Sequence, residues 1–253
     1  FEDRPQDAIL AVRSLRSLAR ACERESPLIF QLVGLALERL YWEGTQVLLG
    51  HGIGDAALFA ELREPLAEAD VSEQFRRVMG FEASMARSAE LDYLRRLHDE
   101  AEVLRYFSHV ADQYSRYSEA EWSGESSAPR KPVVMPEMRY AAQKFKAAEA
   151  LRELAFVALD LYLESRRGGS FPADLSNYPG ASNNAYTGEV LAYRVETDGS
   201  AGIGIPGAVE LWKARNAPHD EYPPRFSWRL PPPPSELDPI FEDLQAEALR
   251  EEW

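Results

Sequence analysis

Cysteine is nearly missing from this sequence, which has only Cys22 among its 253 residues. A single cysteine forms no internal disulfide and no cluster of thiolate metal ligands. Long apolar runs are missing too, because the longest, residues 28–37, is interrupted by Gln31 and followed by Glu38. A transmembrane helix needs about 20 consecutive apolar residues, so no segment of this chain is predicted to span a membrane.

Basic residues are too few to form a surface for nucleic acid. The chain has 28 Lys and Arg against 42 Asp and Glu, and its formal net charge is −14. Proteins that bind phosphate backbones gather positive charge on one surface, whereas the basic residues here are scattered among acids. Nucleic acid is therefore not a predicted partner.

Catalytic signatures are also absent. The sequence has no Gly-x-Ser-x-Gly elbow, Walker loop, dinucleotide glycine pattern or Cys–His arrangement. The run GIGIPG, residues 202–207, is predicted to lack the following helix that phosphate binding requires. His98, Glu102 and His109 have a spacing that suits metal ligands, but the charged residues around them favour an ordinary helix surface. No catalytic residue, cofactor or metal ligand is predicted.

The sequence does contain strong helical periodicity. Apolar residues recur every three or four positions, with charged residues between them, over most of the first 167 residues. The predicted helices cover residues 5–25, 28–49, 55–66, about 72–122 and 136–167. The helix at 28–49 is apolar on most faces, which predicts a central position in the fold.

The pattern changes after Gly168-Gly169. Three runs, EVLAYRVE, AVELWKA and RFSWRL, alternate between apolar and polar residues and are separated by turn residues, which predicts three short antiparallel strands. The predicted fold is mainly α, a multi-helix bundle with a small C-terminal antiparallel β module, and α+β overall. The predicted units are a helical bundle at 1–122, a proline-rich linker or exposed loop at 123–135, a long helix with a small sheet at 136–230, and a proline spacer with an acidic amphipathic tail helix at 231–253.

Residues 140–230 resemble the periplasmic end of the major pseudopilins of type II secretion systems. Their long helix ends in a "Y…GxYP" element, and a "DPWGxPYxY"-like hairpin follows it. The residues that match these two elements are Tyr162, Gly169, Phe171 and Pro172 for the first, and Tyr186, Gly188 and Tyr193 for the second. The chain differs from a pseudopilin in having four helices before this region and in lacking carboxylates where that family binds calcium.

The whole chain resembles a group of bacterial envelope proteins of unknown function, in which a helical body precedes a pseudopilin-like ending. Residues 17–86 and 148–195 carry this resemblance. It implies a periplasmic or extracytoplasmic protein, with membrane tethering through residues before Phe1 as one arrangement.

The C-terminal tail is the predicted contact with partners, because a proline spacer followed by an amphipathic helix suits docking in a groove. Its apolar residues are Leu237, Ile240, Phe241, Leu244, Leu249 and Trp253. A tail that folds back on its own domain is the alternative. The predicted function is a non-enzymatic scaffold or accessory subunit of a membrane-associated assembly, with other protein subunits as partners. Two alternatives stay open: a hydrolase of envelope polymers that uses paired carboxylates, such as Glu82 with Glu90, and a ligand-binding helical module.

Overall fold

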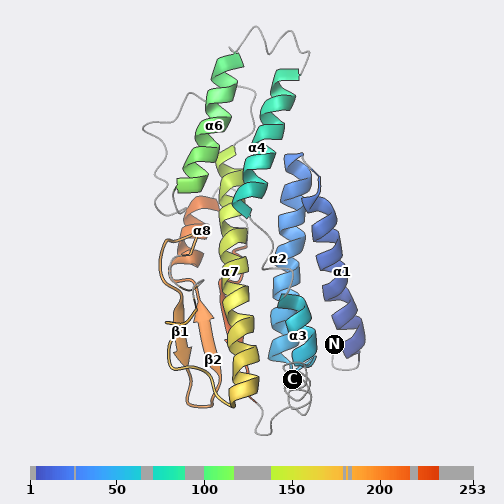
Figure 1. The fold of residues 1–253 in the computed structure, drawn as a ribbon, viewed down its shortest axis with the longest axis vertical. Coiled ribbons are helices and arrows are strands. Elements are labelled where there is room, and N and C mark those ends of the chain that lie inside the picture. The colour runs from blue at the N-terminus through green and yellow to red at the C-terminus, as the bar shows by residue number, and fades with distance from the viewer. Residues whose placement is uncertain are drawn as a thin grey trace, which may run out of the picture.

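The computed structural model describes residues 4–25, 27–63, 71–88, 100–116, 138–178, 181, 184–216 and 222–233. These residues form seven helices and one three-stranded antiparallel sheet, which confirms the predicted fold class (Figure 1). The helices are α1 (Pro5–Glu23), α2 (Leu28–Gly50), α3 (Ala56–Arg63), α4 (Val71–Ser88), α6 (Glu100–Arg116), α7 (Met138–Gly168) and α8 (Ala208–Asn216). The strands are β1 (Ala192–Val195), β2 (Ala201–Gly204) and β3 (Ser227–Leu230). None of these helices is both long and apolar enough to cross a membrane.

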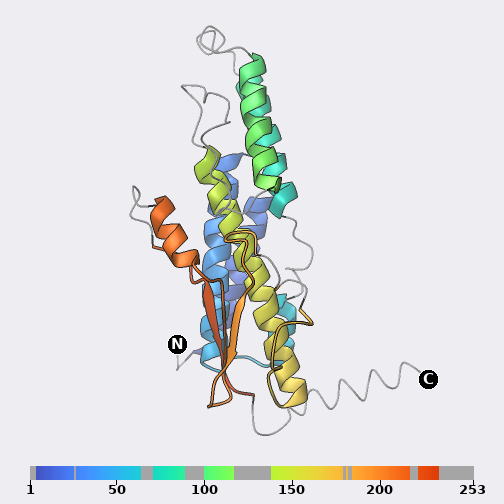
Figure 2. The same cartoon turned by 90° about the vertical axis from the view of Figure 1, so that its left-hand side faces the viewer.

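Helix α7 occupies the centre of the fold, a position that the sequence predicts for α2. It contacts α2, α3, α4, α6 and the sheet (Figures 1 and 2). Alanines such as Ala142, Ala150 and Ala158 are completely buried along it and let neighbouring elements approach closely. Helix α2 is rich in apolar residues for a different reason: it buries one apolar face and exposes further apolar side chains to solvent.

Helices α4 and α6 replace the single long helix predicted at about 72–122. Helix α4 ends at Ser88, α6 begins at Glu100, and the two pack side by side (Figure 1). Phe75 of α4 stacks on Tyr114 of α6, with 4.2 Å between ring centroids. Two shorter helices bury apolar faces against each other that one continuous helix would leave exposed.

The sheet has the order β1-β2-β3, and one of its predicted strands is wrong. Residues 208–214 belong to α8, because Gly207 adopts φ +67° and Ala208 and Trp212, one helical turn apart, are both buried. The middle strand is instead β2, whose register pairs Ile203 with Tyr193 and Trp228. Glycine at two of its four positions hides the alternation from the sequence.

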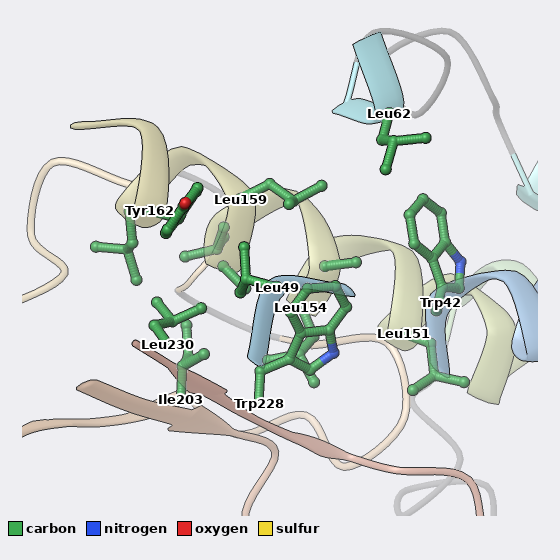
Figure 3. Close-up of a cluster of buried hydrophobic side chains, with 14 of the residues drawn as sticks. Trp42, Leu49, Leu62, Leu151, Leu154, Leu159, Tyr162, Ile203, Trp228 and Leu230 are labelled. Atoms are coloured by element: carbon green, nitrogen blue, oxygen red, sulfur yellow. The ribbon is translucent and has the colours of Figure 1, made fainter. Parts of the chain in front are cut away.

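Two clusters of buried side chains hold these elements together. The larger one joins α1, α2, α3 and α7 to the sheet, and Figure 3 shows Leu49, Leu154 and Trp228 within it. The smaller one joins α2, α4, α6 and α7 around Phe75 and Phe145. Each cluster includes residues from both sides of segment 123–135, which itself lies outside the described residues.

Candidate functional site

A groove lies between α2, α7 and α8, with a cavity of about 260 Å³. Figure 2 shows α8 and α2 on the same side of α7, which forms the floor. The lining residues are Leu32, Leu35, Ala36 and Arg39 from α2, Tyr140, Lys144, Ala147, Ala148 and Leu151 from α7, Trp212 from α8, and Pro224. Most of these side chains are apolar, so the groove suits the binding of apolar groups.

The charges at the groove are positive. The Lys144 ammonium group lies 4.0 Å from the ring centroid of Trp212 and 4.6 Å from that of Tyr140. Arg39 donates hydrogen bonds to the carbonyl oxygens of Tyr222 and Pro223, at 3.0 and 3.3 Å. Of the described residues that line the groove, none carries a carboxylate. The Arg39 guanidinium also donates from Nε to the Glu43 carboxylate at 2.9 Å, so its charge is paired within α2.

An exposed apolar stripe on α2 continues from the groove. It consists of Ile29, Val33, Ala36 and Leu40, which follow one another at spacings of four, three and four and therefore lie on one helix face. Ile29 is 64% exposed, Val33 45% and Leu40 50%. Because Ala36 also lines the groove, the stripe and the groove form one apolar surface.

A buried ionic network fixes α2 and the end of α1 to α7. The Arg152 guanidinium donates to Glu38 through Nε and through Nη2, the latter at 2.7 Å, and Nη2 also donates to Glu23 at 2.7 Å. Arg152 and Glu38 are each only 6% exposed. Trp42 adds a hydrogen bond from Nε1 to Glu38. Burial alone would lower the pKa of Arg152, but Glu38 and Glu23 raise it, so the guanidinium stays charged.

A second polar cluster lies one turn away on α7. Glu149 accepts hydrogen bonds from Tyr114 at 2.8 Å and from Ser72 at 3.3 Å, and Lys146 lies 3.4 Å from it. Glu153 accepts a hydrogen bond from the backbone N–H of Ala185. Burial, reinforced by the charge of Glu149, raises the pKa of Glu153 to about 7. The cluster therefore links α7 to the segment that leads into the sheet.

The raised pKa of Glu153 predicts a pH-dependent stability. An unfolded glutamate titrates near pH 4.5, so the folded protein binds the extra proton between about pH 4.5 and 7, and stability falls as the pH rises through this range. Glu153→Gln keeps an acceptor for Ala185 and removes this fall. We expect the variant to gain about 1–3 kcal/mol over wild type at pH 8 and nothing at pH 4, measured by urea unfolding. The exposed Glu189→Gln should show no such gain; equal effects from both would contradict the assignment.

The first predicted pseudopilin element lies at the end of α7. Gly169 adopts φ +73° and its N–H bonds the Ser165 carbonyl oxygen, which confirms the predicted helix end. Tyr162 is buried edge-on against Phe59, with 5.2 Å between ring centroids, and Phe171 is buried just after the helix. These residues close the lower end of the core.

The second predicted element holds the connection to the sheet. Tyr186 is completely buried and stacks on Phe226, and Gly188 adopts φ +75°. The Tyr193 hydroxyl donates to the Pro172 carbonyl oxygen at 2.8 Å, which joins the two elements. Their contacts are structural, and the relation to pseudopilins stays a prediction.

Some of the other predicted residues lie outside the described part of the chain, and the rest have a structural role. The tail residues Leu237, Ile240, Phe241, Leu244, Leu249 and Trp253, together with His98 and Glu90, lie outside the described residues. Glu82 accepts a hydrogen bond from the backbone N–H of Leu28 at 2.8 Å and so satisfies the start of α2. The prediction that no helix follows residues 202–207 is wrong, because α8 begins at Ala208. Glu210 lies in the first turn of α8, and its negative charge disfavours the binding of an anion at the start of this helix.

The sequence did not single out the groove or Arg152. The sequence signal that could have indicated the groove is that α2 is apolar on most of its faces. A helix that buries a single stripe needs fewer apolar residues, so the extra ones indicate a second apolar surface. Comparisons with protein families, with curated proteins and with solved structures found no match for this chain. The function is therefore argued from the groove and the stripe themselves.

Proposed function

We propose that this protein is a non-enzymatic scaffold or accessory subunit of an extracytoplasmic, membrane-associated assembly. The observation that carries the proposal is the continuous apolar surface formed by the groove and the α2 stripe. Contiguous apolar surface on a soluble domain marks an interaction site, because its exposure to water is unfavourable until a partner covers it. The extracytoplasmic location rests on the resemblance of residues 17–86 and 148–195 to bacterial envelope proteins.

The shape of the surface favours a helical partner. Two helices, α2 and α8, form walls above α7, and an amphipathic helix binds such a groove through apolar residues at spacings of three and four. The partner class is therefore a protein subunit that presents an amphipathic helix.

The described cavities support one of the two alternative functions better than the other. A hydrolase needs two carboxylates facing one cleft. The described residues that line the groove include no carboxylate, and those that line an open hollow of about 480 Å³ beside β1 include one, Asp174. A ligand-binding module is favoured by the apolar lining of the groove. A small molecule that stays bound in native mass spectrometry of the purified protein would support this second candidate.

Substituting Val33 in the stripe tests the scaffold function. Tagged full-length protein would be purified from its native membranes in mild detergent, and its partners quantified by mass spectrometry. Val33→Glu places a charge at the centre of the stripe, so we expect stoichiometric partners to decrease at least about tenfold. Because Val33 is half exposed, the thermal unfolding midpoint should change little.

The matched control is Val190→Glu, which changes another exposed valine, on the segment leading into β1. It should keep the same partners as wild type. A wild-type protein that is purified without partners, or one whose partners are unaffected by Val33→Glu, would overturn the proposal.

A further inference from the structure

Helices α1 and α2 lie side by side as an antiparallel hairpin at one edge of the fold (Figure 1). Two glycines of α2 bring the helices close, since Gly34 lies against Cys22 of α1 and Gly44 lies against Val12. A Cβ atom at Gly44 would approach the Val12 side chain to 2.9 Å, so a larger residue would push the helices apart. The two helices therefore present one joint surface in place of two separate ridges.

The outward rows of the two helices lie on the same side of the hairpin. On α1, a hydrogen bond to the Glu61 carbonyl oxygen directs Arg16 toward α3. On α2, an ion pair with Arg152 directs Glu38 toward α7. Side chains on the opposite side of each helix, at about 100° per residue, are Ala11, Ser14 and Leu18 of α1 and Ile29, Val33, Ala36 and Leu40 of α2. These exposed residues form the hairpin face.

The charged side chains of the hairpin lie outside this face. Between Leu10 and Cys22, and between Ile29 and Val47, they are Arg13, Arg16, Arg20, Glu38, Arg39 and Glu43. The first two donate to Glu61 of α3, and Glu38 is buried against α7. Arg39 and Glu43 pair with each other beside the groove. Burial raises the pKa of Glu23 and the charges of Arg152 and Arg20 act against it, which places Arg20 on the α7 side.

Ser14 is the polar residue of the hairpin face, and its hydroxyl already has a partner. It donates to the Leu10 carbonyl oxygen one turn back, at 2.8 Å. Burying this hydroxyl leaves its hydrogen bond intact, so little is lost. Leu18, which is 55% exposed, adds apolar surface beside the α2 stripe. The hairpin face can therefore be buried without leaving a charge or a polar side chain unpaired.

Charge and area both favour a second copy of this protein as the occupant. The chain carries a net charge of −14, so two copies repel each other unless they meet where neither is charged. In a two-fold symmetric contact a surface meets its own counterpart, which suits a face with charge of neither sign. From Ile29 to Val47 the face is about 27 Å long, and two packed helices are about 20 Å wide. Two such faces would bury about 1,100 Å² in total, which is enough for a specific dimer.

We propose that the hairpin face binds the hairpin face of a second copy, so that α1 and α2 of both copies form a four-helix bundle. This contact rests on the proposed scaffold function, because it uses the α2 stripe, and it names a second copy as one of the subunits. The groove is left for the amphipathic helix of another subunit.

A charge placed on the α1 half of the face tests the contact. Purified full-length wild type should show a mass that rises with concentration toward that of a dimer in analytical ultracentrifugation. Leu18→Glu brings two carboxylates into the apolar contact, so we expect association at least about thirtyfold weaker. The matched control is Ser17→Glu, which adds the same charge about 100° away around α1 and should leave association within about twofold of wild type.

Wild type that stays monomeric at all concentrations, or equal effects from Leu18→Glu and Ser17→Glu, overturns the second copy. If Leu18→Glu fails to fold, Ser14→Glu places the charge at another exposed position of the face and should weaken association in the same way. Added salt should strengthen the dimer by screening the repulsion between acidic copies, and a dimer that salt dissociates would contradict an uncharged contact. Monomeric wild type that sediments with phosphatidylcholine vesicles, when Leu18→Glu does not, would assign the face to a lipid surface instead.

Leu18 also separates this contact from the scaffold function. It lies outside the groove and the α2 stripe, so Leu18→Glu should keep the partners recovered from native membranes, whereas Val33→Glu should lose them. A monomeric wild type that still recovers these partners overturns the second copy alone. A dimer recovered without any other subunit overturns the scaffold function alone.

Discussion

Replacing Arg152 with methionine is expected to lower the free energy of unfolding by about 3–5 kcal/mol. Methionine fills a similar volume, so the main change is the loss of the positive charge. Glu38 is 6% exposed and would be left in the interior beside Glu23 without a cation. An unpaired buried charge is much more costly than a missing surface ion pair, because water no longer solvates it. Urea unfolding at pH 7 measures the effect.

The exposed ion pair between Arg13 and Glu61 provides the matched control, since both side chains are more than 40% exposed. Arg13→Met should cause a much smaller loss than Arg152→Met, because water solvates Glu61 after the exposed pair is broken. The added substitution Glu38→Gln should recover part of the loss in Arg152→Met while keeping an acceptor for Trp42. Similar losses for Arg152→Met and Arg13→Met would show that the buried network does not stabilise the fold.

The fold class could be predicted from the sequence because periodicity reports which faces are buried. The ends of α2 and α7 are marked by Gly50 and Gly169, and the start of α3 by Asp55, whose carboxylate accepts a hydrogen bond from the Leu58 N–H. Where side chains do not carry the pattern, the prediction fails. The glycines of β2 hide a strand, and alternation in residues 208–214 describes a short helix equally well.

The candidate site was beyond prediction because it depends on contacts between distant segments. Glu38 and Arg152 are 114 residues apart, and periodicity does not show that two charged residues on apolar helices will pair. The groove needs α8, which was predicted as a strand, to supply Trp212 opposite α2. Exposure of the α2 stripe is likewise set by which neighbours reach that helix.

Leu154→Ala is expected to destabilise the helical body and the β module together. Leu154 is completely buried on α7 and lies in the cluster that contains Leu49 of α2 and Trp228 of β3 (Figure 3). Truncating a buried leucine costs about 2–5 kcal/mol, because apolar contact is lost and a cavity remains. For a chain of this size the unfolding midpoint should fall by about 5–15 °C. Calorimetry and circular dichroism measure it.

The number of transitions is the sharper result of the same experiment. Because one core joins α2, α7 and the sheet, we expect a single cooperative transition in wild type and in Leu154→Ala, with helix and aromatic signals moving together. Leu40→Ala, on the exposed stripe, should leave the midpoint nearly unchanged. If Leu154→Ala splits unfolding into two steps, the β module is an independent unit that only rests on α7. If Leu154→Ala instead lowers the midpoint of one single transition, the helical body and the sheet unfold together around α7. The groove on α7 and the sheet then belong to the same cooperative unit.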